Sequence, residues 1–487
     1  MSSKEVSPEA RSDLFSEWLD AIEFDPVDDL LWPPFSNSYS PESWTPLCCD
    51  QPVQAVAVAG FSDEDEDIVP PAKQSRKDGS AYSTSARLSS NAPRRKGSAQ
   101  LSSSSARKES RWAERLLNLC ATAIEERNVA RVQHQFYVLR ELSSETRDVN
   151  HRLAAHGLQA LTRKLAGASS ASLRSPFAGA DPRFFHHALV IFHELSPWFT
   201  IAYTLANVTL LETFRSATVS DAADRTVHLI DIGISHGIQW PTLLEAFACE
   251  PRGPPSLVRL TVVADVAGAP FAAGPTDNDF PTRLKRFAKS VNVSLEVNIV
   301  QGELGKLTAG DLGVREEERV AICFQFRLHQ LGKERKRILG FLRNLSPEIV
   351  VLSDNDVDYR SSVGMAARFG RKAELFRQFL DSTSVEFKGK KYCEERLAVE
   401  RQAGMAVLSC EDQGNDQREG RWWEVGMEEV GFVRVALNER VLEAGRALLK
   451  KHDGNWGMKV EEGCASLSWK GQPVTFCSLW KPATLNT

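Results

Sequence analysis

The segment from Asp231 to Gly237 (DIGISHG) has the residue types of a cofactor-binding turn. In parallel sheets, glycine turns beyond a strand's carboxyl end let cofactors approach backbone amides. S-adenosylmethionine would need an acid, closely spaced glycines and a second-strand carboxylate, for which Asp265 is the candidate. Ser235 and His236 stand where a further glycine would ease cofactor approach. We therefore favour a tight turn in which Asp231 caps neighbouring amides, with S-adenosylmethionine binding as the alternative.

Other polar residues near the same strand ends do not form a reactive set. His228 and His236 have no cysteine or carboxylate at metal-ligand spacing, so we predict no metal site and interpret His228 as a hydrogen-bonded core residue. Polar groups after two later strands could line a cleft, although solvated loop side chains are the simpler interpretation: Arg327, His329, Asp354 and Asp356. We predict no catalytic group, no cofactor and a protein that is not an enzyme.

These residues must be positioned by alternating strands and helices. Compact apolar strands are predicted at 225–232, 257–266, 293–300, 320–326 and 349–352. Helices are predicted between or after them at 239–247, 281–291, 335–345 and 365–380. Such alternation predicts a parallel sheet covered on both faces.

The two flanks of this alternating region differ from it. Before it, apolar residues recur at helical spacing from Trp112 onward, including a helical stretch from Pro182 to about Phe214. After it, short strands at 456–461, 465–469 and 474–480 predict an antiparallel meander. The predicted fold is a doubly wound, methyltransferase-like (Rossmann-type) α/β sheet with an antiparallel C-terminal hairpin and an all-helical N-terminal cap. We place the cap at about 112–216 and the α/β core at 217–487.

Residues 1–111 are polar and strongly charged, which predicts a disordered tail. Residues 1–70 carry 2 basic and 16 acidic side chains, whereas residues 71–111 carry 10 basic and 2 acidic ones. Within the acidic part, the segment from Asp13 to Phe24 either folds as a helix into a partner's groove or is a tail with stray hydrophobic residues. Within the basic part, Arg94, Arg95 and Lys96 are candidates for nuclear import, and a solvated linker is the alternative.

Two further groups of residues raise the question of nucleic-acid binding. Basic side chains among the apolar positions of the cap are candidate phosphate contacts, although ordinary solvated helix faces look the same: Arg131, Arg140, Arg147, Arg152, Arg163 and Lys164. Five tryptophans near the C-terminus could stack on bases, but their strand and helix settings favour core packing: Trp422, Trp423, Trp456, Trp469 and Trp480.

The overall composition excludes several classes of protein. The chain has 487 residues and a formal net charge of −5, so it is not a uniformly basic nucleic-acid binder. No apolar run is long enough to span a bilayer, and the polar N-terminus does not resemble a secretory signal. Nine scattered cysteines without a C-x-x-C pair favour a reducing compartment with thiols as small core residues.

Five ordered motifs resemble those of the plant GRAS proteins. The stretch after the tail resembles their first leucine-rich region, residues 281–307 the second, 320–400 the PFYRE region, and 478–480 the end of the SAW region. The VHIID motif is matched by Val227, His228, Leu229, Ile230, Asp231, Gly233, Gly237, Gln239, Trp240 and Pro241. The resemblance covers residues 112–487.

The resemblance implies a nuclear transcription regulator with no established transferase activity. It implies pairing with another GRAS protein, typically the second nodulation-pathway member, or with a second copy, together with contact to promoter DNA and no membrane partner. The implied biology is symbiotic (nodulation or mycorrhizal) signalling and strigolactone-related gene expression. The PFYRE region departs from the family at Ser353-Asp-Asn-Asp, where an acid-rich pattern is common, so no function is transferred to that position.

Overall fold

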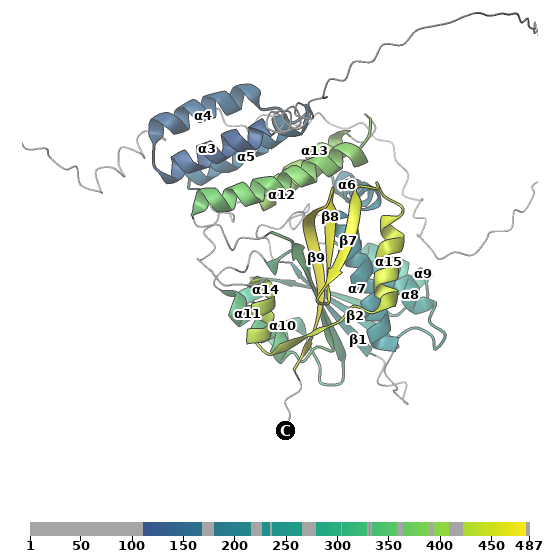
Figure 1. Cartoon of the computed structure of the whole chain (residues 1–487). Helices are drawn as coiled ribbons and strands as arrows, with labels where there is room; N and C mark the ends of the chain where they lie inside the picture. The colour runs from purple at the N-terminus through teal and green to yellow at the C-terminus, as the bar shows by residue number, and fades with distance from the viewer. Residues whose placement is uncertain are drawn as a thin grey trace, which may run out of the picture. The chain divides into compact units, whose positions relative to one another are not determined.

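A computed structural model describes most of the chain after the tail (Figure 1). It describes residues 111–167, 180–215, 226–233, 236–264, 279–302, 304–328, 331, 334–357, 364–389, 393–408 and 422–483. The acidic segment, the import candidates Arg94, Arg95 and Lys96, and the candidates Asp265, Ser235 and His329 lie outside these residues. Among the described residues, no helix is long and apolar enough to cross a membrane.

A nine-stranded sheet forms the centre of the described structure. Its parallel half has the order β3-β2-β1-β4-β5 and consists of β1 (Thr226–Ile232), β2 (Leu257–Ala264), β3 (Leu295–Gln301), β4 (Arg319–Gln325) and β5 (Ile349–Asn355). All five predicted strands are confirmed. Because β1 pairs with both β2 and β4, the strand order reverses between β1 and β4, which is where doubly wound sheets form a crevice.

The antiparallel half is built from the C-terminal segment. It consists of β6 (Phe432–Val435), β7 (Trp456–Glu461), β8 (Cys464–Trp469) and β9 (Gln472–Pro482). Both hairpin turns have two residues at positive φ, Glu462-Gly463 and Lys470-Gly471, which suits the right-handed twist of the strands. The predicted meander is therefore confirmed, and its last strand, β9, joins the sheet directly beside β5.

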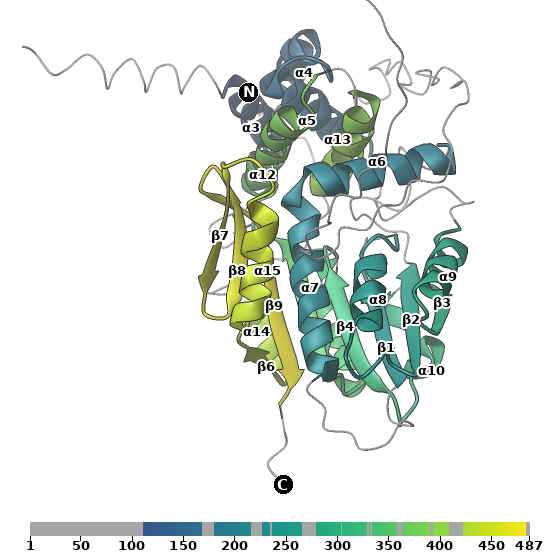
Figure 2. The ribbon, with the colours of Figure 1, turned by 90° about the vertical axis from the view of Figure 1, so that its right-hand side faces the viewer.

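Helices cover both faces of the sheet. One face carries α7 (Pro197–Arg215), α8 (Trp240–Ala248), α9 (Phe280–Ser290) and α15 (Glu439–Leu449), which lie side by side in Figure 2. The other carries η4 (Leu304–Lys306), α10 (Ala309–Leu312), α11 (Arg335–Asn344) and α14 (Trp422–Glu429). Alternate residues of β1 and β4 enter two separate apolar cores, as expected for strands buried on both sides.

A helical bundle lies beyond one end of the sheet (Figure 1). It contains α3 (Trp112–Glu125), α4 (Val129–Leu142), α5 (Val149–Leu165) and α6 (Pro182–Leu195), as the sequence predicts. It also contains α12 (Met365–Glu386) and α13 (Cys393–Val407), which pack against α3, α5 and α6. The bundle therefore combines two distant parts of the chain, which the sequence did not indicate.

The helical stretch predicted from Pro182 to Phe214 is two helices. Ser196 has an extended backbone between α6 and α7, with φ −121° and ψ 129°. The residue before a proline is disfavoured in helical geometry, and Pro197 follows directly. This break directs α7 away from the bundle and onto the sheet, where it packs against β4, β5 and β9.

Candidate functional site

The VHIID segment forms β1 and the turn that follows it. Val227 and Leu229 face the core beneath α7 and α8, whereas Ile230 and Ile232 face the opposite core. Asp231, on the side of Val227, lies opposite Cys323 of β4. The segment therefore places one carboxylate at the point where the strand order reverses, inside the molecule and 2% exposed.

Asp231 is held by a tryptophan. The Nε1 atom of Trp240, the first residue of α8, donates a 2.9 Å hydrogen bond to Oδ2 of Asp231. Trp240 is 1% exposed, and Pro241 follows it in the first helical turn, where a missing amide costs nothing. The sequence predicted that Asp231 caps backbone amides; the partner seen here is a side chain, so this prediction missed the role of Trp240.

The two glycines of the turn permit close packing. A Cβ on Gly233 would lie 2.7 Å from Oδ1 of Asp231. Gly237 has φ +85°, and a Cβ there would lie 2.6 Å from the ring of Phe280 on α9. Both glycines thus admit neighbouring side chains of this chain, which is the role that cofactor atoms would have at a binding turn.

A hydrolase nucleophile elbow has the pattern glycine-x-serine-x-glycine, and the sequence was interpreted as breaking this pattern at the second glycine. That interpretation is wrong, because Gly233, Ser235 and Gly237 have the complete spacing. An elbow needs a sharp turn from strand to helix, whereas residues 233–239 separate β1 from α8. The neighbouring His236 packs edge-on against Phe185 with 5.0 Å between ring centroids, and burial lowers the pKa of its imidazole to about 4. The chain therefore has the residue spacing of a nucleophile elbow without the strand-to-helix geometry of one.

Gln239 joins α7 to the start of α8. Its Nε2 donates to Oδ1 of Asn207 over 3.1 Å, and Nδ2 of Asn207 donates to the Gln239 carbonyl over 2.9 Å and to Thr242 over 2.8 Å. Asn207 was not predicted from the sequence, because its partners follow 32 or more residues later in the chain.

A buried polar row extends from the turn across three strands. Gln325 of β4 lies opposite Ser353 of β5, which lies opposite Cys477 of β9. Gln325 is fully buried, and neither polar atom of its amide has a hydrogen-bond partner among the residues that the structure describes. Burial is the main cause that raises the pKa values of the Tyr203 hydroxyl and the Cys323 thiol well above their usual ranges, and the charge of Asp231 is the second cause. Both groups are therefore protonated. The row is electrically neutral except for Asp231.

The other predicted rim residues are structural. Arg327 is buried and donates from Nη1 to the Val263 carbonyl over 3.3 Å. Asp354 is buried and accepts a 2.7 Å hydrogen bond from the Asn355 amide, and Asp356 accepts one of 2.7 Å from Ser466. Arg327 and Asp354 are thus not the solvated groups that the sequence favoured, because β5 extends three residues further than predicted and carries Asp354 into the sheet.

His228 has the structural role that the sequence indicated. Its ring bonds Glu318 through Nδ1 at 3.0 Å and Thr261 through Nε2 at 2.8 Å, and it is fully buried. Arg259 also pairs with Glu318, so the carboxylate is neutralised. Within the part of the chain that the structure describes, no group of three histidine, cysteine or acidic residues could hold a metal ion.

The basic candidates of the bundle do not all lie on the surface. Arg152 was predicted as a phosphate contact, and this is wrong: it is 1% exposed, pairs with Glu400 of α13 and donates to the Leu380 carbonyl of α12 over 3.0 Å. It faces inward because it joins α5 to both late helices. Arg131 pairs with Glu126 at 3.1 Å. The remaining candidates are exposed or half-buried: Arg140, Arg147, Arg163 and Lys164.

The tryptophans pack in the core. Trp423 stacks on Phe476 with 4.1 Å between ring centroids, and Trp480 is fully buried. Trp456 and Trp469 donate from Nε1 to acids of α12, Glu386 at 3.0 Å and Asp381 at 2.7 Å. The packing interpretation is confirmed for these four residues, and the side chain of Trp422 lies outside the described part.

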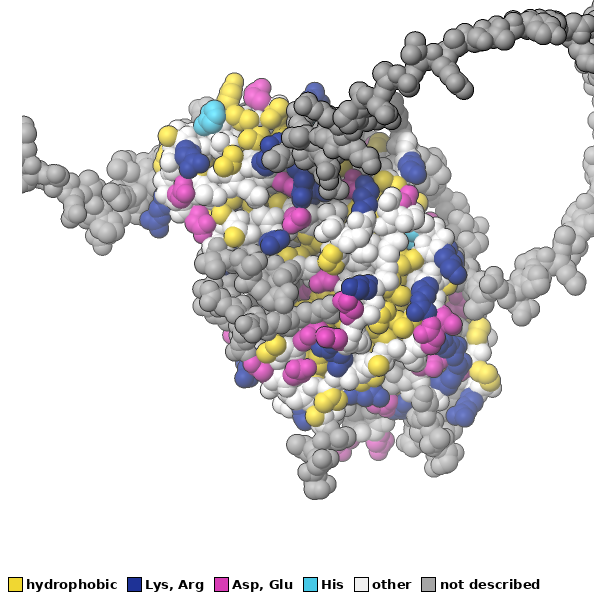
Figure 3. Space-filling view, in the orientation of Figure 1, with side chains coloured by type: hydrophobic (Ala, Val, Ile, Leu, Met, Phe, Trp, Pro, Cys, Tyr) yellow, Lys and Arg dark blue, Asp and Glu magenta, His cyan; other side chains and the backbone are white. Residues whose placement is uncertain are grey.

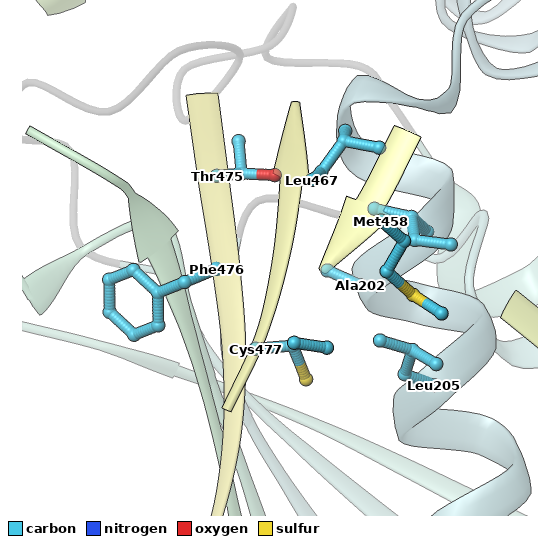
Figure 4. Close-up of a pocket in the computed structure, with 9 residues that line it drawn as sticks. Ala202, Leu205, Met458, Leu467, Thr475, Phe476 and Cys477 are labelled. Carbon is cyan, nitrogen blue, oxygen red and sulfur yellow. The ribbon is translucent and has the colours of Figure 1, made fainter. Parts of the chain in front are cut away.

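An apolar gap separates α7 from the C-terminal strands (Figure 4). Ala202 and Leu205 line it from the helix, and Met458, Leu467 and Cys477 from the strands. The ring of Phe476 points to the other side of β9. The gap is too narrow to admit a water molecule, so it offers no room for a ligand.

Comparison with known proteins agrees with this architecture. A model of the GRAS domain family matches residues 113–481, and the chain belongs to this family. It is 44% identical over 390 residues to the Protein NODULATION SIGNALING PATHWAY 1 of Lotus japonicus, covering 77% of this chain and 71% of that one. It is 42% identical over 395 residues to Scarecrow-like protein 29 of Arabidopsis thaliana, covering 79% and 75%.

A solved structure shares the fold. The crystal structure of SCL7 in Oryza sativa superposes with a TM-score of 0.56 at 26% identity, covering 72% of this chain and 94% of that one. The family expected from the five motifs is therefore confirmed.

Proposed function

We propose that this GRAS protein is a nuclear transcription regulator that is not an enzyme and uses a methyltransferase-like sheet as a rigid platform. The observation that carries the proposal is the hydrogen bond from Trp240 to Asp231 at the reversal of strand order. Doubly wound enzymes bind ligands at this place. Here, Phe280 packs over Gly237, and the indole of Trp240 donates a hydrogen bond to the carboxylate of Asp231. The chain's own side chains therefore take up the positions that a cofactor would use.

The regulator acts on promoter DNA together with another GRAS protein, for which the second nodulation-pathway member is the leading candidate, or with a second copy of itself. Large apolar side chains are exposed on α3 and α4, namely Leu119, Tyr137 and Leu142. Figure 3 shows hydrophobic side chains at the upper edge of the molecule, where these helices lie. Exposed apolar side chains clustered on neighbouring helices favour a protein partner.

The process is symbiotic signalling, nodulation or mycorrhizal, with strigolactone-related gene expression among its outputs. Two relatives named for nodulation signalling, from Lotus japonicus and Medicago truncatula, each share 44% identity with this chain. Arg94, Arg95 and Lys96 are the proposed import signal. The acidic segment from Asp13 to Phe24 supplies a contact to the transcription machinery.

Two alternatives make different predictions. A methyltransferase is favoured by the strand order β3-β2-β1-β4-β5 and by the acid and glycines after β1. If the protein is a methyltransferase, calorimetric titration with S-adenosylmethionine should give a saturable heat of binding, and the Asp231→Ala variant should lose this heat. A scaffold co-regulator requires association with DNA only through a separate DNA-binding protein.

A gel-shift experiment on the full chain tests the proposal. Promoter fragments are titrated with and without a candidate GRAS partner, at several salt concentrations. The proposal expects a shifted band that weakens steeply with salt, because counterions are released when phosphates are contacted. No band at low salt, even with the partner present, would remove DNA contact and leave the scaffold.

A further inference from the structure

We propose that the solvent-facing side of α9 contacts the phosphate backbone of DNA through three cations, Lys285, Arg286 and Lys289, here called the α9 stripe. The inference rests on the proposed function, because it assumes that DNA is bound. It deepens that function by placing a phosphate-contacting surface outside the helical bundle. The occupant is the DNA backbone, since the stripe offers positive charge without an aromatic or apolar groove.

The stripe arises from the amphipathic pattern of α9. Leu284 and Ala288 are buried against the sheet, whereas the three stripe residues are exposed. Lys285 and Lys289 are four residues apart and Arg286 and Lys289 three apart, so all three share one face of the helix. They span about 6 Å along the axis. Phosphates of one DNA strand follow each other every 3.4 Å of helix axis, so the stripe matches two neighbouring phosphates.

The stripe is not neutralised by the chain itself. Residues 280–290 contain no acid, and the three side chains take part in no ion pair or side-chain hydrogen bond within the described residues. The nearest acid along the sequence is Asp279, the N-cap, which accepts a 3.1 Å hydrogen bond from the Thr282 amide. Hydrogen bonds from Thr282 lower the pKa of Asp279, and the charge of Arg286 contributes to this effect. Asp279 therefore balances part of the charge of Arg286 and leaves the charges of Lys285 and Lys289 unbalanced.

Several cations on other helices form ion pairs, whereas the three side chains of the α9 stripe form none within the described residues. Arg337 pairs with Glu334 on α11, Arg371 with Glu374 on α12 at 3.5 Å, and Arg440 of α15 with Glu212 of α7 at 2.6 Å. Figure 3 shows basic and acidic side chains interspersed over the face that it presents. Like charges at helical spacing destabilise a helix by a few tenths of a kcal/mol per pair. An uncompensated row of this kind is explained by an anionic partner.

The position of α9 makes the stripe accessible. It is the outermost helix of its layer, above β3, the edge strand of the sheet (Figure 2). Arg283 of α9 lies close to His186 of α6: burial lowers the pKa of that imidazole to about 4, Arg283 adds to the effect, and His186 is therefore uncharged at neutral pH. The exposed Arg183 precedes His186 by one helical turn. A duplex lying along α9 would therefore meet basic and uncharged side chains but no acidic one on that helix.

The test compares two triple variants of the full chain. The first is Lys285→Ala/Arg286→Ala/Lys289→Ala. The control is Lys450→Ala/Lys451→Ala/Lys481→Ala, which removes three exposed cations near the C-terminus and changes the net charge equally. Binding to a mixed-sequence duplex of about 30 base pairs is measured by fluorescence anisotropy between about 50 and 200 mM salt, with and without a GRAS partner. Circular dichroism checks that both variants are folded, as expected for exposed sites.

The expected result is a change in salt dependence. Each lost phosphate contact reduces the slope of log K against log salt by about 0.9, so the stripe variant, which loses two such contacts, should lose about 2 units of slope and roughly 10- to 100-fold in affinity. The control should keep the slope of the parent. A parent that binds DNA with a stripe variant of unchanged slope would overturn this inference and leave the proposed function intact. A parent that binds no DNA under any condition would overturn both.

Discussion

The Nε1 atom of Trp240 lies 2.9 Å from Oδ2 of Asp231, and both residues are almost fully buried. A hydrogen bond to a carboxylate in such surroundings is strong, because the carboxylate has been removed from water. The pair links β1 to the first turn of α8 and occupies the place where doubly wound sheets hold ligands. It therefore defines what this turn contributes to the molecule: support for the sheet.

Removing the indole donor should destabilise the fold. Trp240→Phe keeps an aromatic ring but leaves Asp231 without this hydrogen bond, and we expect a loss of about 2 to 3 kcal/mol in the free energy of unfolding. Urea denaturation followed by circular dichroism measures it. Trp198→Phe is the matched control, since Trp198 is equally buried and lies in the same core. Equal losses in the two variants would assign the effect to ring size instead of the hydrogen bond.

Two glycines should respond in opposite directions to alanine. Gly237→Ala places a Cβ against Phe280 in a residue with φ +85°, so we expect a loss of about 2 to 4 kcal/mol. Gly340 lies inside α11, where an added Cβ would meet no atom within 4 Å, so Gly340→Ala should gain about 1 kcal/mol from helix propensity. Thermal unfolding of both variants checks the signs. A neutral Gly237→Ala would mean that α9 does not pack tightly on the turn.

Gln325 should be dispensable for stability. Its buried amide has no partner in the described part of the chain, so Gln325→Met, which keeps the length of the side chain, should raise the free energy of unfolding by about 1 kcal/mol. Gln239→Met is the comparison, because it breaks the bond to Asn207 and should cost about 1 to 2 kcal/mol. Chemical denaturation ranks the two. A clear loss of stability in Gln325→Met would show that the amide has a bound partner, such as an internal water.

The ion pair of Arg152 and Glu400 should show strong coupling. Arg152→Met leaves a buried carboxylate, and we expect a loss of about 3 to 5 kcal/mol, whereas adding Glu400→Gln should recover much of it. Burial raises the pKa of Glu400 and Arg152 opposes this, so the single variant should hold a proton there at higher pH. When folding raises the pKa of an acid, the free energy of unfolding falls as the pH rises above the pKa that this acid has in the unfolded chain. A double-mutant cycle at pH 5 and pH 8 measures this, and additive losses would contradict it.

Glu386 should make the stability of the protein depend on pH. Burial raises its pKa to about 8, with Asp453 adding to the effect and the bonds from Ser196 and Trp456 opposing it. The folded state therefore holds a proton that the unfolded state releases near pH 4.5, and stability should fall as pH rises from there to about 8. Glu386→Gln should flatten that fall by up to about 5 kcal/mol over the whole range. Urea midpoints of parent and variant at pH 6 and pH 8.5 provide the test; parallel curves would refute it.

Local patterns in the sequence determined the elements of the core. Strands buried on both faces leave continuous apolar runs, and helices leave a period of 3.6, so β1 to β5, β7 to β9 and the helices α8, α9, α11 and α12 were predicted. The elements β6, α13, α14 and α15 were not predicted. The break at Pro197 was missed, although proline is a local signal, because the apolar pattern continues across it. The position of Asp231 at the carboxyl end of β1 also followed from the sequence, since chain direction alone decides which end of a parallel strand bears the turn.

The tertiary structure decided which side chains meet. Arg152 and Glu400 are separated by 248 positions and Trp469 and Asp381 by 88, distances at which no periodicity relates one residue to the other. The same holds for α12, whose sequence resembles a crossover helix but which packs on α3 in the bundle. Even α9, predicted as a helix, showed its unpaired basic face only once the fold placed its apolar side on the sheet. Local sequence sets the conformation of each segment, whereas burial of one segment against another determines which of its charges remain for a partner.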